Sequence, residues 1–208
     1  MNKSMTVTYE VDGSLYVNVT NRCTNRCSFC IRNNGDGAYG SDSLWLLREP
    51  TAEEILDSIF SRNLSLYREL VFCGYGEPAM RLEVCREVAL RVKEKYQSIR
   101  VRINTNGQSD LIYSRDTSEV YRGAFDSVSV SLNSPTSEGY FEMCRPVYGK
   151  DTLSAILSFV KNVKNCVQNV ALSVVREYLS EEELALCHEI ADNLGVALRV
   201  RTYIGAEN

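Results

Sequence analysis

The chain has 208 residues, a formal net charge of -4, and 44% hydrophobic and 24% charged residues. This length suits one domain or at most two and is enough for a substantial core. The small negative charge gives no general attraction to phosphate backbones, and no nucleic-acid base-reading motif is visible. The sequence contains neither a run of about 18 apolar residues nor a secretion signal. We therefore expect a cytoplasmic protein without a membrane segment.

Short apolar or β-branched runs alternate with helical patterns along the chain. Six runs are predicted strands, at residues 15–20, 69–73, 100–105, 127–132, 169–175 and 197–203. Two helices are predicted to begin with a capping box, one at Thr51 with Glu54 and one at Ser180 with Glu183. Residues 81–96 and 151–163 have apolar residues at helical spacing, whereas residues 110–122 are less regular.

Strands that alternate with helices predict parallel strands joined by right-handed crossovers. A closed barrel of eight such units takes about 250 residues. The sequence therefore predicts an α/β fold, a partial, open (β/α)6 TIM-like barrel, with a flat doubly wound sheet as the alternative. In both folds the chemistry is expected at the carboxyl ends of the strands.

Three cysteines, Cys23, Cys27 and Cys30, lie in a short segment directly after the first predicted strand. A loop of this kind can turn its sulfurs toward one centre, and iron-sulfur clusters are commonly held by four thiolates. No fourth cysteine or histidine is near in sequence, so a cluster here would keep one iron free to bind a reactant. Structural zinc requires a fourth ligand, and the histidine, His188, lies far along the chain. A thiol relay through Cys27 and Cys30 would leave Cys23 unused.

Polar and glycine-rich segments follow the next strands. Gly74-Tyr75-Gly76-Glu77 follows the second, where the glycines allow close backbone approach to a ligand and the carboxylate can bind an ammonium group. Asn104 and Asn106 end the third strand, and Ser129, Ser131 and Asn133 are expected on one face of the fourth, where they can bond to a sugar. Each segment is also ordinary turn sequence, which is the alternative interpretation.

Together these motifs resemble the radical S-adenosylmethionine (radical SAM) enzymes. The spacing Cys-x3-Cys-x2-Cys, with Phe29 before the last cysteine, resembles the cluster loop of that family, and Gly74-Tyr75-Gly76-Glu77 resembles its Gly-Gly-Glu motif. In finer detail, residues 73–78, 104–107, 131–136 and 144–149 resemble the short radical SAM proteins associated with TatD-type nucleases.

The resemblance implies a [4Fe-4S] cluster on Cys23, Cys27 and Cys30, with S-adenosylmethionine (SAM) on the fourth iron. An electron donor such as flavodoxin or ferredoxin would reduce the cluster. SAM would then be cleaved to a 5'-deoxyadenosyl radical that abstracts hydrogen from an unidentified substrate. The cofactor-binding residues that we expect are Phe29, Gly74, Tyr75, Gly76, Glu77, Asn104, Asn106, Ser131, Asn133 and Arg176. Glu77 and the glycines would hold the methionyl ammonium, Ser131 and Asn133 the ribose, and the Phe29 segment the adenine.

One segment departs from the family pattern. Many members have Gly-x-Ile-x-Gly-x-x-Glu on the fifth strand, whereas residues 172–177 read Leu-Ser-Val-Val-Arg-Glu, so adenine contacts from this strand stay unassigned. Arg176 can bind the cofactor carboxylate or an anionic substrate group, or it can pair with a neighbouring glutamate.

Cys144 follows the fourth strand and has two interpretations. It either donates a hydrogen atom to a substrate radical, as a catalytic residue, or packs in the core.

We expect residues 1–208 to form a single radical SAM core domain without an auxiliary cluster domain, because the sequence contains no second cysteine cluster. An open barrel suits a macromolecular substrate or a partner protein that closes it, and a small metabolite is the alternative. A noncatalytic binding module stabilised by zinc or by a cluster is the rival function.

Overall fold

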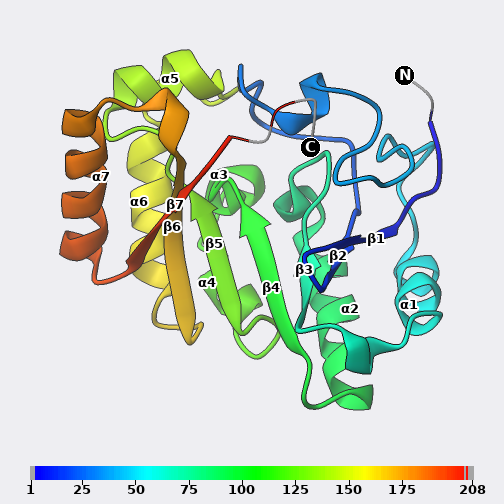
Figure 1. Ribbon diagram of the computed structural model, residues 1–208. Helices are drawn as coiled ribbons and strands as arrows, with labels where there is room; N and C mark the ends of the chain where they lie inside the picture. Colours follow the sequence, from blue (N-terminus) through cyan, green and yellow to red (C-terminus); the bar gives the residue numbers. More distant parts are fainter. Residues whose placement is uncertain (1–2, 204, 206–208) are drawn as a thin grey trace.

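In the computed structural model the described residues are 3–203 and 205. They contain one seven-stranded sheet whose strands lie side by side in chain order (Figure 1). The strands are β1 (Thr8–Val11), β2 (Ser14–Val17), β3 (Glu69–Phe72), β4 (Arg100–Thr105), β5 (Ser127–Ser131), β6 (Asn169–Val175) and β7 (Ala197–Arg201). Strands β2 to β7 are parallel to one another, which confirms the six predicted strands and the open parallel barrel.

The first strand, β1, is an addition to the predicted fold, because it pairs antiparallel with β2. Asp12 and Gly13 form the turn between them with positive φ angles of 45° and 71°. Asp-Gly is a preferred two-residue hairpin sequence, since a type I′ turn requires positive φ at both positions. The prediction that all strands are parallel is therefore wrong for this pair, and the Asp-Gly dipeptide was the signal that could have identified it.

The helices confirm both predicted capping boxes, at Thr51 before α1 and at Ser180 before α7. The irregular segment at residues 110–122 forms two short helices, and the helix that ends at Cys144 was not predicted. The α-helices are α1 (Ala52–Phe60), α2 (Leu82–Lys95), α3 (Ser109–Tyr113), α4 (Ser118–Tyr121), α5 (Ser137–Cys144), α6 (Thr152–Val163) and α7 (Glu181–Leu194). Short 3-10 helices are η1 (Ile31–Asn33), η2 (Leu64–Leu66), η3 (Pro78–Arg81) and η4 (Arg176–Tyr178). No helix in the described part of the chain is long and apolar enough to cross a membrane.

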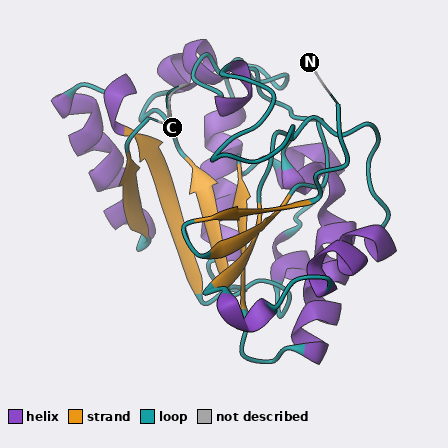
Figure 2. Cartoon of the chain, turned by 45° about the vertical axis from the view of Figure 1, so that its right-hand side comes forward, coloured by secondary structure: helices purple, strands orange, loops and turns teal. Residues whose placement is uncertain are grey.

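The two faces of the sheet differ in polarity. The face toward the helices is apolar and buried, with side chains such as Leu70, Phe72, Ile103, Val130 and Leu172. The helices flank this face and lie behind the strands, so the opposite face of the curved sheet is left open (Figures 1 and 2). We call this opposite face the inner face.

The inner face is unusually polar for a barrel. A closed barrel fills its interior with branched apolar side chains. Here the alternation of the strands gives the inner face residues such as Arg102, Asn104, Ser127, Ser129 and Arg199. Loops and α5 gather at the end to which the arrowheads of β4 and β5 point in Figure 1. The candidate site is built at that end.

Candidate functional site

The cysteine loop leaves β2 and is held by the end of α5. The backbone N–H of Arg26 donates to the carbonyl of Cys144 at 2.9 Å, and that of Ser28 donates to Met143 at 3.1 Å. These are carbonyls of the last turn of α5, which have no partner within the helix. The loop thus provides donors for the last carbonyls of α5. These hydrogen bonds in turn hold the loop at the carboxyl edge of the sheet.

The three predicted metal ligands are free, partly exposed thiols on this loop. Burial and the nearby Glu77 carboxylate raise the pKa of Cys23 to about 12, and burial raises the pKa of Cys30. The metal-free thiols are therefore protonated, and a metal that binds them must displace protons. Within residues 3–203 and 205, no three Cys, His, Asp or Glu side chains are gathered closely enough to hold a metal ion. The donor set fits a thiolate-bound cluster in its chemistry, while the convergence of the three sulfurs stays a prediction.

Glu77 lies at the start of η3, where its buried carboxylate is strongly hydrogen-bonded. It accepts hydrogen bonds from the Thr105 hydroxyl at 2.7 Å, the Ala79 N–H at 2.9 Å and the Asn106 N–H at 2.7 Å. Burial raises the pKa of Glu77, and these three bonds oppose that shift. An ionised carboxylate offers about four acceptor positions. One acceptor position is therefore without a hydrogen-bond partner among the described residues.

Asn106 connects three parts of the site. Its backbone binds Glu77, and its Nδ2 donates to the Thr24 hydroxyl at 2.8 Å and lies 3.9 Å from the sulfur of Cys23. The end of β4 is thereby joined to both the Gly-Tyr-Gly-Glu segment and the cysteine loop. Its amide is occupied by the protein itself, so Asn106 acts here as a positioning residue.

Gly74 and Gly76 allow the segment after β3 to pack closely against the chain that leaves β2. A Cβ at Gly76 would lie 2.3 Å from the carbonyl oxygen of Thr20 and 2.7 Å from that of Arg22. A Cβ at Gly74 would lie 2.2 Å from Oδ1 of Asn18, which is buried without a hydrogen-bond partner among the described residues. Both positions exclude a side chain because the chain packs against itself there, while the close approach of this backbone to a ligand stays a prediction.

Tyr75 packs into a second apolar cluster. It is 3% exposed, its ring lies 5.1 Å from that of Trp45, and its hydroxyl donates to the carbonyls of Gly35 and Gly37. These contacts fix the loop that follows the cysteines. The structure thus gives Tyr75 a packing role.

Cys144 is fully buried at the end of α5. Nδ2 of Asn133 lies 3.4 Å from its sulfur, and its thiol is hydrogen-bonded with that of Cys27. The hydrogen bond with Cys144, followed by burial, raises the pKa of Cys27. No fourth cysteine is near the loop in sequence, but the fold places one beside a predicted ligand.

Ser129, Ser131 and Asn133 were expected on one face of the sheet, but only the two serines lie on the same face. β5 ends at Ser131, and Asn133 adopts a left-handed φ of 59° that breaks the alternation. Its amide turns to Cys144 and is buried, whereas Ser131 pairs with Ser173 on the inner face.

Asn104 also lies on the inner face, at the end of β4. Its Oδ1 accepts a hydrogen bond from Arg102 at 2.8 Å, and its side chain is hydrogen-bonded with Cys73. Both contacts are within the protein, so the role of Asn104 toward a cofactor stays a prediction.

Phe29 is part of an aromatic group that spans the open side of the barrel. Its ring lies 4.9 Å from that of Tyr178, which follows β6, and Tyr178 lies 5.5 Å from Tyr203, which follows β7. The Tyr203 hydroxyl lies 3.2 Å from Oδ1 of Asn34 in the loop after the cysteines. No periodic pattern in the sequence indicated Tyr178 or Tyr203, because their contacts depend on how far the sheet curves.

Arg176 lies at the start of η4, and its guanidinium group bonds to other residues of the protein. It forms an ion pair with Glu181 and donates to the carbonyl of Leu179 at 2.8 Å. This is the alternative that the sequence left open, in which Arg176 pairs with a neighbouring glutamate.

A buried polar network beneath the cysteine loop was not predicted. Nε2 of Gln108 donates to Oδ1 of Asn25 at 2.7 Å and to the Tyr140 hydroxyl at 3.0 Å, and Nδ2 of Asn25 also reaches Tyr140 at 3.0 Å. Oε1 of Gln108 has no hydrogen-bond partner among the described residues, but the three hydrogen bonds restrict the segments that they join. Here they join the loop to the chain after β4 and to α5, which are far apart in sequence.

Comparison with known proteins identifies the family of this chain. The Radical SAM superfamily pattern matches residues 17–189, a span from β2 to within α7. The chain therefore belongs to the radical SAM superfamily. No curated protein matches the chain.

Solved structures of radical SAM proteins share the fold. Streptococcus suis SuiB bound to S-adenosylmethionine is 16% identical with a TM-score of 0.66, over 91% of this chain and 40% of SuiB. The HydG maturase of Carboxydothermus hydrogenoformans is 17% identical with a TM-score of 0.65, over 92% of this chain and 44% of HydG. A Sphaerobacter thermophilus radical SAM methyltransferase is 15% identical with a TM-score of 0.62, over 96% of this chain and 70% of that protein. The chain thus spans about two fifths of the length of SuiB.

Proposed function

We propose that this chain is an enzyme that binds a [4Fe-4S] cluster through Cys23, Cys27 and Cys30 and cleaves SAM reductively. The observation that carries the proposal is the position of the Cys-x3-Cys-x2-Cys loop. It is held at the carboxyl end of an open parallel barrel, in a chain that matches the Radical SAM superfamily. The cluster and SAM supply a 5'-deoxyadenosyl radical that abstracts hydrogen from the substrate, and the protein supplies binding, orientation and shielding.

The residues around the loop have distinct roles in this proposal. The remaining acceptor position of Glu77 takes the methionyl ammonium, and the backbone at Gly74 and Gly76 lies alongside that group. Ser131, on the inner face, binds the ribose. The ring of Phe29, beside Tyr178, packs against the adenine. Asn106 and the network of Gln108 hold the loop in place.

The proposed function also requires an electron donor, and the sequence motifs support a closer relationship within the superfamily. A one-electron donor such as flavodoxin or ferredoxin would reduce the bound cluster, and we place the protein in the cytoplasm. The segments at residues 73–78 and 144–149 support a relationship to the short TatD-associated radical SAM proteins. The described residues form one continuous sheet, which supports a single core domain over residues 1–208. One SuiB structure contains a precursor peptide, and an open inner face suits a macromolecular substrate here too.

The test is anaerobic reconstitution with iron and sulfide, followed by dithionite and SAM. We expect about four irons per chain, as for a [4Fe-4S] cluster, and formation of 5'-deoxyadenosine. C27A should lose both, whereas C166A, which removes a partly exposed thiol outside the loop, should lose neither. Tightly held zinc without 5'-deoxyadenosine would instead favour the noncatalytic binding module.

A further inference from the structure

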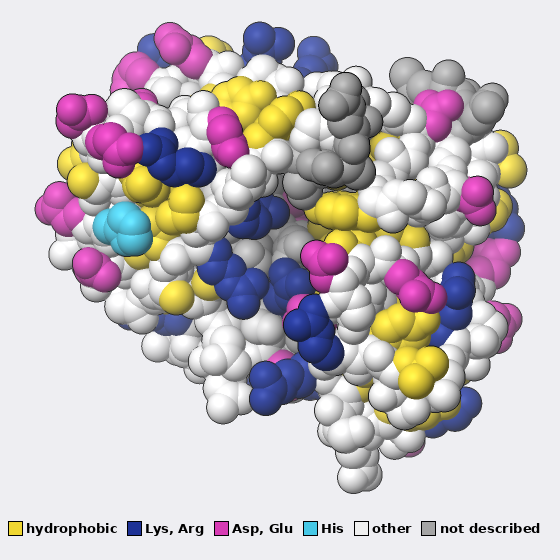
Figure 3. Space-filling view, viewed as in Figure 1, with side chains coloured by type: hydrophobic (Ala, Val, Ile, Leu, Met, Phe, Trp, Pro, Cys, Tyr) yellow, Lys and Arg dark blue, Asp and Glu magenta, His cyan; other side chains and the backbone are white. Residues whose placement is uncertain are grey.

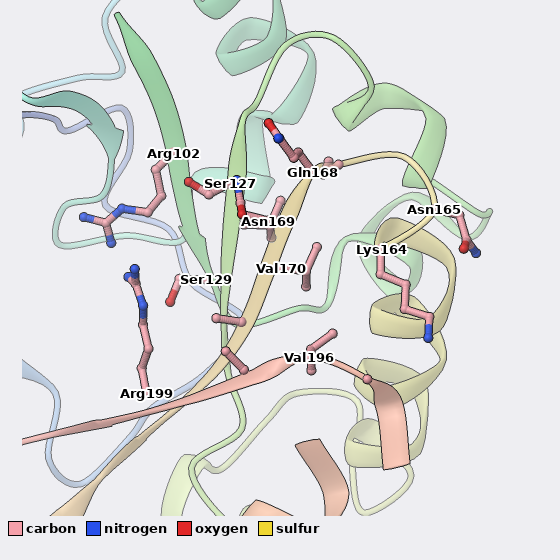
Figure 4. A pocket seen from close by; sticks show the side chains of 15 residues that line it. Arg102, Ser127, Ser129, Lys164, Asn165, Gln168, Asn169, Val170, Val196 and Arg199 are labelled. Atoms are coloured by element: carbon pink, nitrogen blue, oxygen red, sulfur yellow. The ribbon is translucent and has the colours of Figure 1, made fainter. Parts of the chain in front are cut away.

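The amino half of the inner face contains a polar cavity that the proposed cofactor site does not use. It has a volume of about 470 Å³, and its lining includes Arg102, Ser127, Ser129, Lys164, Asn169 and Arg199. Figure 4 shows Arg102 extending from β4 and Arg199 from β7, with Ser129 near both in that view. In Figure 3, Lys and Arg side chains gather in and around a hollow on this side of the molecule.

The strand register explains why these residues share a face. Arg102 pairs with Ser127, and Ser127 pairs with Asn169 across three adjacent parallel strands. Residues opposite each other in a sheet project to the same side. Arg199 pairs with Ser173, and Arg201 follows it by two residues, so both arginines of β7 also project to the inner face.

The positive charges on this face are unequally neutralised. Arg102 forms a 2.7 Å ion pair with Glu69 and is only 12% exposed in its side chain. Lys164 donates a hydrogen bond to the carbonyl of Leu194 at 2.7 Å and so provides a partner for the last carbonyl of α7. Arg199 and Arg201 form no ion pair with any residue in the described part of the chain. Among the residues that the structure describes, these two positive charges on the inner face therefore have no carboxylate partner.

The charge of Arg201 also reaches toward the candidate cofactor site. Burial raises the pKa of Cys73 at the end of β3, and the charges of Arg201 and Arg102 oppose that shift. Cys73 directly precedes the Gly-Tyr-Gly-Glu segment. The charge of Arg201 therefore acts on a group at the carboxyl end of the sheet.

We propose that Arg199 and Arg201 bind a phosphate group of the substrate on the inner face, with the hydroxyl of Ser129 as a further donor beside Arg199. The guanidinium fork matches phosphate oxygens in bidentate geometry. A phosphomonoester carries about −1.5 to −2 charges at pH 7. That charge matches two unpaired arginines, whereas a carboxylate would neutralise only one.

The position of Arg199 suits a remote binding group. Its partner Ser173 lies two residues before the end of β6, which is about 7 Å at the usual rise per residue. A phosphate held there leaves the rest of the substrate to extend toward the cysteine loop. Binding energy from a group remote from the reaction can be used to position the reacting atoms. The identification of this ligand as substrate depends on the proposed function.

The competing explanation is that these arginines protect the exposed edge of the sheet from pairing with a strand of another chain. β7 is the last strand of the sheet, and charged side chains on edge strands discourage pairing with other chains. In that case the arginines would bind no particular anion, and the two explanations predict different titrations.

The experiment titrates the full purified chain with inorganic phosphate at constant ionic strength, followed by calorimetry and thermal unfolding. We expect saturable phosphate binding, a rise in unfolding temperature, and at least tenfold weaker binding of acetate. The double variant R199Q/R201Q should weaken phosphate binding at least tenfold. R199K should give an intermediate loss, because it keeps the charge and removes the fork. R86Q removes one positive charge from α2 in the helix layer and should bind phosphate as the parent chain does.

The outcomes separate the explanations. Absent saturable binding, or binding unchanged in R199Q/R201Q, would overturn the phosphate proposal and favour edge protection. Equal binding of acetate would overturn the preference for phosphate. Circular dichroism of each variant checks folding, and R199K keeps the test decisive if the double variant does not fold. Phosphate titration requires neither cluster nor SAM, so failure of reductive cleavage would leave this result intact, and failure of phosphate binding would leave the radical chemistry intact.

Discussion

The thiols of Cys27 and Cys144 are hydrogen-bonded to each other, although one lies in the cysteine loop and the other ends α5. The contact is supported by two backbone hydrogen bonds from the loop to the end of α5. A fourth sulfur is therefore adjacent to a predicted cluster ligand. Replacing Cys144 therefore tests the proposal that one iron of the cluster is left free for SAM.

We predict that C144A keeps the iron content of the parent chain, because Cys23, Cys27 and Cys30 suffice as protein ligands. Its unfolding free energy should fall by about 1 kcal/mol, since a buried sulfur is removed. Iron and sulfide are measured after anaerobic reconstitution, with C187A as a control for loss of another buried thiol. Iron loss equal to that of C27A would identify Cys144 as a ligand and contradict the open iron. Unchanged turnover of a substrate, once one is found, would dismiss Cys144 as a hydrogen donor.

We predict that G76A disrupts the cysteine loop. The added methyl group would meet the backbone carbonyls of Thr20 and Arg22 at 2.3 and 2.7 Å, so the chain must shift where the loop begins. Overpacking of this kind costs about 1–3 kcal/mol. The unfolding temperature and the iron content after reconstitution should both decrease. G35A is the matched control, because its Cβ would meet only the Gly37 carbonyl, at 3.9 Å. Normal iron content in G76A would show that the close approach is dispensable.

We predict that E77Q destabilises the chain by about 1–3 kcal/mol, measured by urea unfolding. The amide can keep one oxygen for Thr105 and Ala79, but its nitrogen then faces the Asn106 N–H and leaves that buried donor without an acceptor. E83Q is the control on α2. Its ion pair with Arg115 is exposed, and such pairs contribute little, about 0–1 kcal/mol. Equal stability of E77Q and the parent chain would contradict the internal role of this carboxylate.

We predict that the capping box of α1 loses its contribution in acid. Hydrogen bonds from Arg48 and then from the Thr51 N–H lower the pKa of Glu54 from 4.5 to about 2. A carboxylate whose pKa is lower in the folded state stabilises the fold above its unfolded pKa, and that contribution disappears as pH falls through the folded pKa. The difference in unfolding temperature between the parent chain and E54Q should therefore shrink from pH 4.5 to about 2.

The partner variant R48Q supplies the control for this titration. It removes the largest cause of the lowered pKa, so the remaining loss should start at the same pH, near 4.5, but be complete at a higher pH and span a narrower range. A difference between the parent chain and E54Q that stays constant down to pH 2 would show that the carboxylate contributes through its shape and not through its charge.

The sequence was sufficient for features that depend on local spacing. The helix starts at Thr51 and Ser180 follow from a four-residue pattern, because both hydrogen bonds of a capping box form within one turn. The six parallel strands follow from runs of apolar residues, which are also a local feature of the sequence. The hairpin at Asp12 and Gly13 was also present as a local signal and was missed.

The tertiary structure decided the contacts between distant segments. The neighbours of Glu77 and Cys144 come from other strands and helices, and no spacing in the sequence encodes those distances. The same holds for Arg199 and Arg201. Their residue type was visible in the sequence, but their position on an open, helix-free face follows from strand order and register. Local periodicity fixes which way a side chain points from its own strand, whereas the curvature of the whole sheet determines what it meets there.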